Sequence, residues 1–153
     1  MSKFRDQFER LPTGYFYLEV FRKGSLIEVV DEKNLIVVGS QNTHANLLGG
    51  NVINQSVTKI GFGINLTPPV FPNTALTTPY IKAIDSVTYP GSNEVQFNFS
   101  LGVGGGDSGA YDLAIGEFGL LTGLSVLYAR KTRSAPLNFN SDISFQGSWT
   151  ISF

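Results

Sequence analysis

The sequence has no cysteine, a single histidine and few charged residues. Only 15% of its 153 residues are charged, whereas an ordinary soluble domain has about 25%. The absence of cysteine excludes disulfide scaffolds, thiolate metal sites and thiol catalysis, and one imidazole excludes a multi-histidine metal site within one chain. The formal net charge of −1 leaves no basic surplus for a phosphate backbone, so we expect no nucleic-acid partner.

Long hydrophobic runs are missing as well. No stretch reaches the ~18 apolar residues of a transmembrane helix, and residues 1–10 lack the apolar segment of a signal peptide. We therefore expect no membrane partner and a protein made in the cytoplasm. Hydrophobic residues nevertheless make up 42% of the chain, which is too many for a disordered protein. The length suits one domain.

The few charges are unevenly distributed. Just over half of them lie in residues 1–33, and the rest of the chain relies on Asn, Ser and Thr for its polar surface. Uncharged polar groups cost less to bury than charged ones. This distribution fits either a surface that packs against neighbouring subunits or an ordinary β domain with Asn-rich turns.

The periodicity of the chain is mostly that of β-strands. Apolar and polar residues alternate cleanly over residues 94–101 and 143–153, the pattern of half-buried antiparallel strands. Further strands are expected at residues 15–22, 25–30, 57–64, 80–89, 114–121 and 126–133, with a turn at 31–34. Gly61 and Gly63 mark a bulge or a close contact. Loops are expected at residues 65–79, which hold four prolines, at 102–109 and at 135–142.

One internal helix is expected, over residues 40–50. Ser40 is its predicted N-cap, and Gly49 or Gly50 its predicted stop. Together these patterns predict a single all-β domain over residues 15–153, an antiparallel β-sandwich or barrel-like fold with one short helix. Residues 1–14 form a predicted N-terminal arm. Phe4, Phe8 and Leu11 recur there at helical spacing and are the expected anchors on a neighbour; the alternative is a frayed terminus.

The glycine-rich segment 104–109 contains two motif-like patterns. It spells G-x-G-x-x-G, but a strand-like sequence follows instead of the helix that a dinucleotide site needs. It also places Ser108 in a protease-like Gly-Asp-Ser-Gly, for which the single His44 is the only possible base. Asp107 and Asp112 are two carboxylates where calcium needs about six oxygen ligands. We expect no catalytic residue, cofactor or metal, and therefore no enzyme.

Glu117 lies within an otherwise apolar predicted strand and needs a partner. If the following hairpin closes symmetrically around residues 123–124, Glu117 stands directly opposite Arg130. We predict a structural cross-strand pair between the two. The neighbouring cations up to Arg133 are interpreted as a solvated face.

Aromatic side chains are abundant, and two uses are open. Trp149, Phe145 and Phe153 share the apolar side of one alternating strand, which favours core packing over a sugar-stacking platform. A carbohydrate-binding module that serves host attachment is nevertheless an alternative function. In that case, exposed aromatics such as Tyr80 and Tyr111 are the expected interaction residues.

Several short segments in the last three quarters of the chain occur in a familiar order. They are Ile-Gly-Phe-Gly (60–63), Val-Gln-Phe-Asn-Phe-Ser-Leu (95–101), Ile-Gly-Glu-Phe-Gly-Leu-Leu (115–121), Leu-Tyr-Ala-Arg (127–130) and Gly-Ser-Trp-Thr-Ile (147–151). Over residues 34–153 this series resembles small structural proteins of tailed bacteriophages, in particular tail-fibre and baseplate-associated β domains. The hairpin of residues 115–130 is also similar to one in tail-collar fibre proteins.

The resemblance implies a non-enzymatic virion protein that assembles as a multimer. It carries no functional residues over to this chain. The expected partners are like subunits, with a trimer favoured, and other virion proteins. A tail, baseplate or fibre-attachment component is the first expectation, and a capsid decoration protein that stabilises the head is the alternative.

Overall fold

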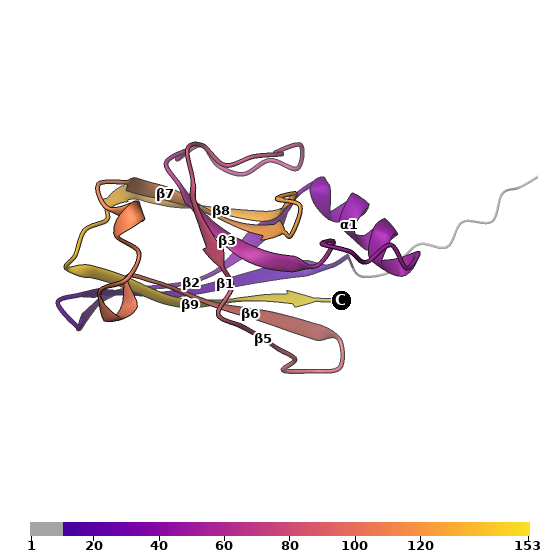
Figure 1. The fold of residues 1–153 in the computed structure, drawn as a ribbon, viewed down its shortest axis with the longest axis horizontal. Helices are drawn as coiled ribbons and strands as arrows, with labels where there is room; N and C mark the ends of the chain where they lie inside the picture. Colours follow the sequence, from indigo (N-terminus) through magenta and orange to yellow (C-terminus); the bar gives the residue numbers. More distant parts are fainter. Residues whose placement is uncertain (1–10) are drawn as a thin grey trace, which may run out of the picture.

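The computed structural model describes residues 11–153. Over this range the chain forms a curled antiparallel sheet and one α-helix, so the predicted all-β class is confirmed (Figure 1). The elements are β1 (Thr13–Arg22), β2 (Ser25–Ile36), α1 (Gly39–Leu48), β3 (Val57–Gly63), β4 (Tyr80–Ala83), β5 (Ser86–Thr88), β6 (Glu94–Leu101), the 3-10 helices η1 (Val103–Gly105) and η2 (Ser108–Ala110), β7 (Ala114–Thr122), β8 (Leu127–Asn138) and β9 (Ile143–Ser152).

The nine strands follow the order β4-β3-β7-β8-β2-β1-β9-β6-β5 and divide into two layers. We call strands β4, β3, β7 and β8 the β7 half, and strands β2, β1, β9, β6 and β5 the β9 half. The halves face each other in Figure 1. They are joined where Leu35 and Ile36 of β2 pair with β8. The structure is therefore sandwich-like, as predicted, but its two layers belong to one continuous sheet.

The chain also connects the two free ends of this sheet directly. The Ile84 N–H donates to the Thr58 carbonyl in β3 at 2.9 Å, and the next N–H, of Asp85, donates to the Asn98 carbonyl in β6 at 2.8 Å. Consecutive residues thus bond to different halves. The expected single strand over residues 80–89 is wrong for this reason: it is split into β4 and β5 at the point where the chain crosses over.

The core lies between the two halves and is rich in aromatic rings. Phe16 contacts Phe118 and Trp149 with ring centroids 4.9 Å apart in each case, so one ring from β1 contacts both β7 and β9. Phe145 and Trp149 are fully buried, which confirms core packing for these two, whereas the prediction is wrong for Phe153, which lies beyond β9 and is 50% exposed. Aromatic side chains bury a large apolar area each and dominate such a core.

Two predicted boundaries are wrong at β1 and β2. The expected turn at residues 31–34 is part of β2, whose pairing with β1 continues to Gly14↔Asn34. The predicted arm, residues 1–14, overlaps β1, because Thr13 and Gly14 already pair with Ser152 and Ile151 of β9. β1 therefore begins two residues inside the predicted arm. No helix among the described residues is long and apolar enough to cross a membrane.

Candidate interaction site

Helix α1 lies across one end of the structure, near the last residue of the chain (Figure 1). It is held there by its buried Ser40 and Thr43, and the Thr43 hydroxyl donates to the Gly39 carbonyl at 3.2 Å. The predicted N-cap, Ser40, is wrong: the cap position is Val38 and no side chain caps it. The predicted stop is confirmed, because Gly49 is the C-cap and Gly50 follows with a φ of +84°, which glycine adopts without strain.

A cluster of exposed aliphatic side chains follows this helix. Leu48 is 93% exposed and Ile53 is 77% exposed. The segment that carries them is tied to the β7–β8 hairpin, where the N–H groups of Gly123 and Leu124 donate to the carbonyls of Ser56 and Asn54. We call this cluster the apolar platform; its exposed members are Leu47, Leu48, Val52, Ile53 and Leu124. Isolated exposed aliphatics are ordinary, whereas a contiguous group of them marks a contact surface.

The stretch of chain that carries most of the apolar platform contains almost no charge. From Asn34 to Ile81 the only charged residue is Lys59. Its ammonium group donates to the Gly123 carbonyl and to the Ser125 hydroxyl, each at 3.3 Å. A partner that covers residues of this stretch therefore desolvates few charges, which keeps the cost of burial low.

Apolar grooves flank α1. One, of about 510 Å³, is lined by residues of α1, β3, β5, β6, β8 and the last strand, among them Leu47, Tyr89 and Phe153. The other, of about 490 Å³, is lined by Leu11, Phe71 and the start of α1. Both grooves include His44, so the helix separates two recesses at the same end of the molecule.

His44 fixes the helix to the sheet. Its Nε2 lies 2.7 Å from the Tyr128 hydroxyl, and its ring packs against those of Tyr128 and Phe153. Burial lowers the pKa of His44 below 6.5 and raises the pKa of Tyr128 well above its ordinary value. Figure 1 shows α1 and the η1–η2 segment at opposite ends of the molecule, so His44 is not positioned to activate Ser108.

The predicted Glu117–Arg130 pair is present and buried. Arg130 Nε donates to Glu117 Oε1 at 2.9 Å, and both side chains are almost fully inaccessible. The predicted register is wrong, however. Glu117 is opposite Thr132, and Arg130 is opposite Gly119. The hairpin already closes one residue off the predicted register, with Leu121 opposite Leu127, and a bulge between Leu120 and Leu121 adds a second residue. The two charges are diagonal neighbours on one face, which is still within reach of long side chains.

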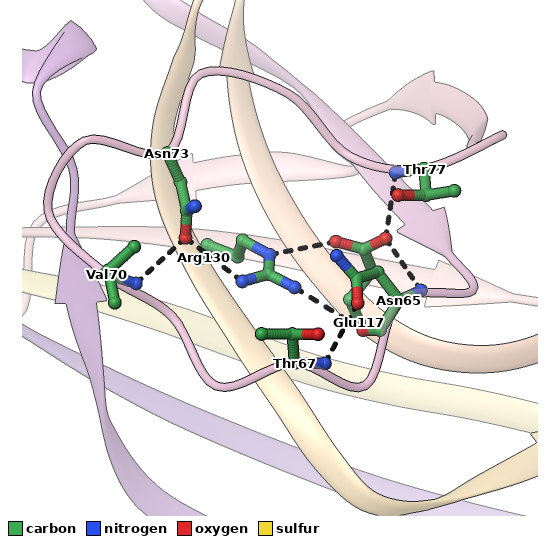
Figure 2. A network of polar contacts seen from close by, with 7 residues as sticks. All are labelled: Asn65, Thr67, Val70, Asn73, Thr77, Glu117 and Arg130. Atoms are coloured by element: carbon green, nitrogen blue, oxygen red, sulfur yellow. Dashed lines mark hydrogen bonds and ion pairs between the residues drawn. The ribbon is translucent and has the colours of Figure 1, made fainter.

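The pair also holds the proline-containing loop that covers β7 (Figure 2). Glu117 Oε2 accepts hydrogen bonds from the backbone N–H groups of Asn65 and Thr77, each at 2.9 Å. Arg130 Nη1 donates to Asn73 Oδ1 at 3.0 Å, and the same oxygen accepts the Val70 N–H. Sequence reasoning found the ion pair but missed these loop partners, which lie far away in the chain.

Glycines make room for this arrangement on the outer face of the β7 half. A Cβ atom at Gly63 would lie 2.6 Å from Glu117 Oε2, and one at Gly61 would lie 2.6 Å from the Leu76 side chain. The close-contact interpretation of both glycines is thereby confirmed. The same loop also contacts the start of α1, where the N–H of the cap residue Val38 donates to the Phe71 carbonyl at 2.9 Å. The buried pair therefore positions one wall of a groove beside the helix.

Tyr80 and Tyr111 are not freely exposed, contrary to expectation. The Tyr80 hydroxyl donates to Asp107 Oδ1 at 2.9 Å, and Tyr111 packs on Phe139 with ring centroids 5.7 Å apart. Both rings are half-buried against the core, because the 3-10 segment folds back over β4.

The Asp107 carboxylate accepts hydrogen bonds from three groups of the protein. Burial by itself would raise the pKa of Asp107, but hydrogen bonds from Lys82, the Gly102 N–H and Tyr80, together with the Lys82 charge, hold it below its ordinary value. Lys82 Nζ lies 2.9 Å from Asp107 Oδ2. Over residues 11–153, no group of three or more histidine, aspartate or glutamate side chains is arranged to hold a metal ion.

The remaining predicted interaction residues lie in or next to the first segment of the chain. Phe4 and Phe8 fall outside the described residues. Leu11 is 74% exposed and lines the groove that also contains Phe71. The prediction that Leu11 contacts a neighbour stays a prediction.

Comparison of this chain with protein-family models, with curated proteins and with solved structures found no match. Among the described residues, the apolar platform and the grooves that flank α1 are the surface features that point to a function.

Proposed function

We propose that this protein is a non-enzymatic structural component of a tailed phage particle and that it assembles through the apolar platform. The expected assembly contains several copies of the chain, with a trimer favoured, and other virion proteins. The exposure of Leu48 and Ile53 within a stretch of chain that contains almost no charge is the observation that carries the proposal. The resemblance of residues 34–153 to phage β domains supplies the virion setting.

The energetics favour an interface at this end. Each aliphatic side chain that passes from full exposure to full burial contributes about 1.5–3 kcal/mol, and the platform has several exposed ones. A stable interface buries about 800 Å² on each partner. The platform and the two flanking grooves together present a recessed, largely apolar surface to a partner.

The buried ion pair contributes by preorganisation. Glu117 and Arg130 hold the loop that carries Val70 and Phe71 in one shape before any partner arrives. A contact surface that is ordered in advance pays less conformational entropy on association. This gives a polar network beneath the surface a role in assembly without any contribution to catalysis.

The self-association of the purified chain tests the proposal. We expect Leu48→Glu and Ile53→Glu each to shift the sedimentation-velocity profile towards monomer, because a carboxylate is placed in the buried interface. Val103→Glu is the matched control, since Val103 is also an exposed aliphatic residue but lies at the opposite end. Equal self-association of all three variants and the parent chain would contradict the role of the platform.

Copy number distinguishes the position on the particle. We propose a tail, baseplate or fibre-attachment component, for which quantitative mass spectrometry of purified virions should find few copies and fractionated tails should retain the protein. A number of copies in proportion to the major capsid protein would identify the alternative, a decoration protein of the head.

A further inference from the structure

The outer face of the β9 half is open and carries rows of hydrogen-bonding side chains. Cross-strand pairing places Gln96 beside Thr150 and Thr150 beside Tyr15. The next row places Asn98 beside Ser148, and Ser148 beside Tyr17. Because cross-strand partners point to the same side of a sheet, β6, β9 and β1 present these side chains on a single surface.

On this surface the small side chains of Ser148 and Thr150 in β9 lie between the longer ones of β6 and β1, and we call the surface the trough. Its floor is β9. Its walls are the longer side chains of β6 on one side and Tyr15 and Tyr17 of β1 on the other. The backbones of β6 and β1, two positions apart in the sheet, are separated by about 9.5 Å. A hollow of about 420 Å³ opens at one end of this trough; it is lined by Thr13, Tyr15, Lys33, Glu94, Thr150 and Ser152.

The polar walls are held in place before any ligand binds. Gln96 Nε2 donates to Asn98 Oδ1 at 2.8 Å, and the Thr150 hydroxyl donates to Gln96 Oε1 at 3.2 Å. On the opposite wall, the Tyr17 hydroxyl donates to Glu19 Oε1 at 2.7 Å. Each of these groups retains further donor or acceptor capacity, so the network is ordered but not saturated.

We propose that this trough binds a neutral oligosaccharide. A sugar ring has an apolar C–H face, which packs on tyrosine rings, and hydroxyl groups that both donate and accept hydrogen bonds. The trough supplies both kinds of contact: Tyr15 is 46% exposed, and amide, hydroxyl and carboxylate groups lie beside it.

The charges around the trough select against acidic sugars. Glu19 and Asp31 lie beside the tyrosines, since Asp31 pairs with Tyr17, and Glu94 lines the hollow together with Lys33. Three carboxylates and one ammonium group repel a uronic or sialic acid. A neutral chain meets no such repulsion, and the carboxylates serve it as acceptors. This activity would add ligand binding to the proposed structural role and does not depend on the platform.

A glycan array that carries neutral, uronic and sialylated oligosaccharides tests the proposal, with calorimetric titration of the strongest binder. We expect a neutral oligosaccharide to bind and the affinity to fall at least tenfold in Tyr15→Ala and in Tyr17→Ala. Ser148→Leu should weaken binding similarly, because it fills the floor and leaves both tyrosines in place. Tyr89→Ala is the matched control: Tyr89 is exposed but lines the groove beside α1, so its loss should leave the affinity unchanged.

Circular dichroism melts establish that each variant is folded. The proposal is overturned if the folded parent chain retains no neutral oligosaccharide on the array, or if it binds only acidic ones. It is also overturned if the tyrosine and Ser148 variants bind as tightly as the parent. Loss of self-association in Tyr15→Ala, with no glycan bound by the parent, would instead assign the trough to a second copy of the chain.

Discussion

The two halves of the curled sheet differ in their outer faces: one is covered by a loop and the other is accessible. In the β7 half, the loop of residues 65–79 covers the outer face, and β7 is buried on both sides from Ile115 to Thr122. In the β9 half, β9 and β6 alternate between buried and accessible residues, and their outer face carries hydroxyl and amide groups. One half encloses an ion pair; the other exposes a polar trough.

The difference shows how the same sheet geometry supports two kinds of polar group. Glu117 and Arg130 are out of reach of water, so each depends on the other and on the loop backbone. Glu32 and Lys131, in contrast, pair at the accessible boundary between β2 and β8, where water screens the charges. A buried charge that loses its partner is costly, whereas an exposed pair contributes little. The stability of the folded chain therefore depends more on the Glu117–Arg130 pair under the loop than on the Glu32–Lys131 pair.

The largest expected effect follows from breaking the buried pair. Glu117→Ala leaves the Arg130 guanidinium without a counter-charge and removes the acceptor of two loop N–H groups. We expect the free energy of unfolding to fall by about 3–5 kcal/mol, as measured by urea denaturation. Glu32→Ala is the matched control on the accessible side and should cost at most about 1 kcal/mol.

A double variant keeps this prediction testable even if Glu117→Ala does not fold. Removing both charges with Glu117→Leu and Arg130→Leu eliminates the unpaired cation, so the double variant should be more stable than Glu117→Ala alone. An equal loss in the free energy of unfolding for Glu117→Ala and Glu32→Ala would contradict the difference between the buried and the accessible pair.

A smaller effect is expected from filling the space beneath the loop. Gly63→Ala would place a methyl group 2.6 Å from Glu117 Oε2, and that carboxylate is held by three hydrogen bonds. We expect a loss of about 1–3 kcal/mol, seen as a lower thermal midpoint. Gly106→Ala is the control, because its nearest atom is 3.6 Å away; it should change the stability by less than about 0.5 kcal/mol. Equal thermal midpoints for Gly63→Ala and Gly106→Ala would contradict the tight fit at Gly63.

The smallest expected effect is a pH dependence of the stability, and it comes from His44, which packs α1 against Tyr128 of β8. The folded chain lowers the pKa of His44 below 6.5 by burial, so the unfolded chain binds this proton more readily. The stability that His44 contributes is therefore fully present above its ordinary pKa of 6.5 and is lost as the pH falls through that value towards the lowered pKa of the folded chain. His44→Gln should remove this slope in urea midpoints. Asp107 has a lowered pKa as well, but its ordinary value is 3.8, so its contribution is lost in a separate, more acidic range. If the urea midpoint of His44→Gln depends on pH as that of the parent chain does, another titrating group causes the dependence.

Much of the fold was predictable from the sequence because many strands face solvent on one side. The alternation over Glu94–Leu101 predicted β6 correctly, since one buried and one accessible face impose a period of two. Residues 31–34 were mispredicted as a turn because four consecutive polar residues carry no such period. Tertiary contacts make them a strand: β1 pairs along their whole length, and Glu32 pairs with Lys131.

The candidate sites were predictable only in part. Glu117 was found because a carboxylate in an apolar strand requires a partner. Its loop partners Asn65 and Thr77 were missed because they offer backbone N–H groups, which no sequence pattern distinguishes. The apolar platform did have a signal, the nearly uncharged stretch from Asn34 to Ile81. Tyr80 and Tyr111 were misjudged as exposed because composition does not show which segment folds over a ring.

The sequence alone determined the class of the fold, the main strands, the helix stop at Gly49–Gly50 and the need to pair Glu117, because these follow from local periodicity, backbone freedom and the cost of an isolated buried charge. The tertiary structure alone decided which outer face is covered, where the chain crosses between the halves at Ile84 and Asp85, and which tyrosines remain accessible. These depend on contacts between residues far apart in the chain.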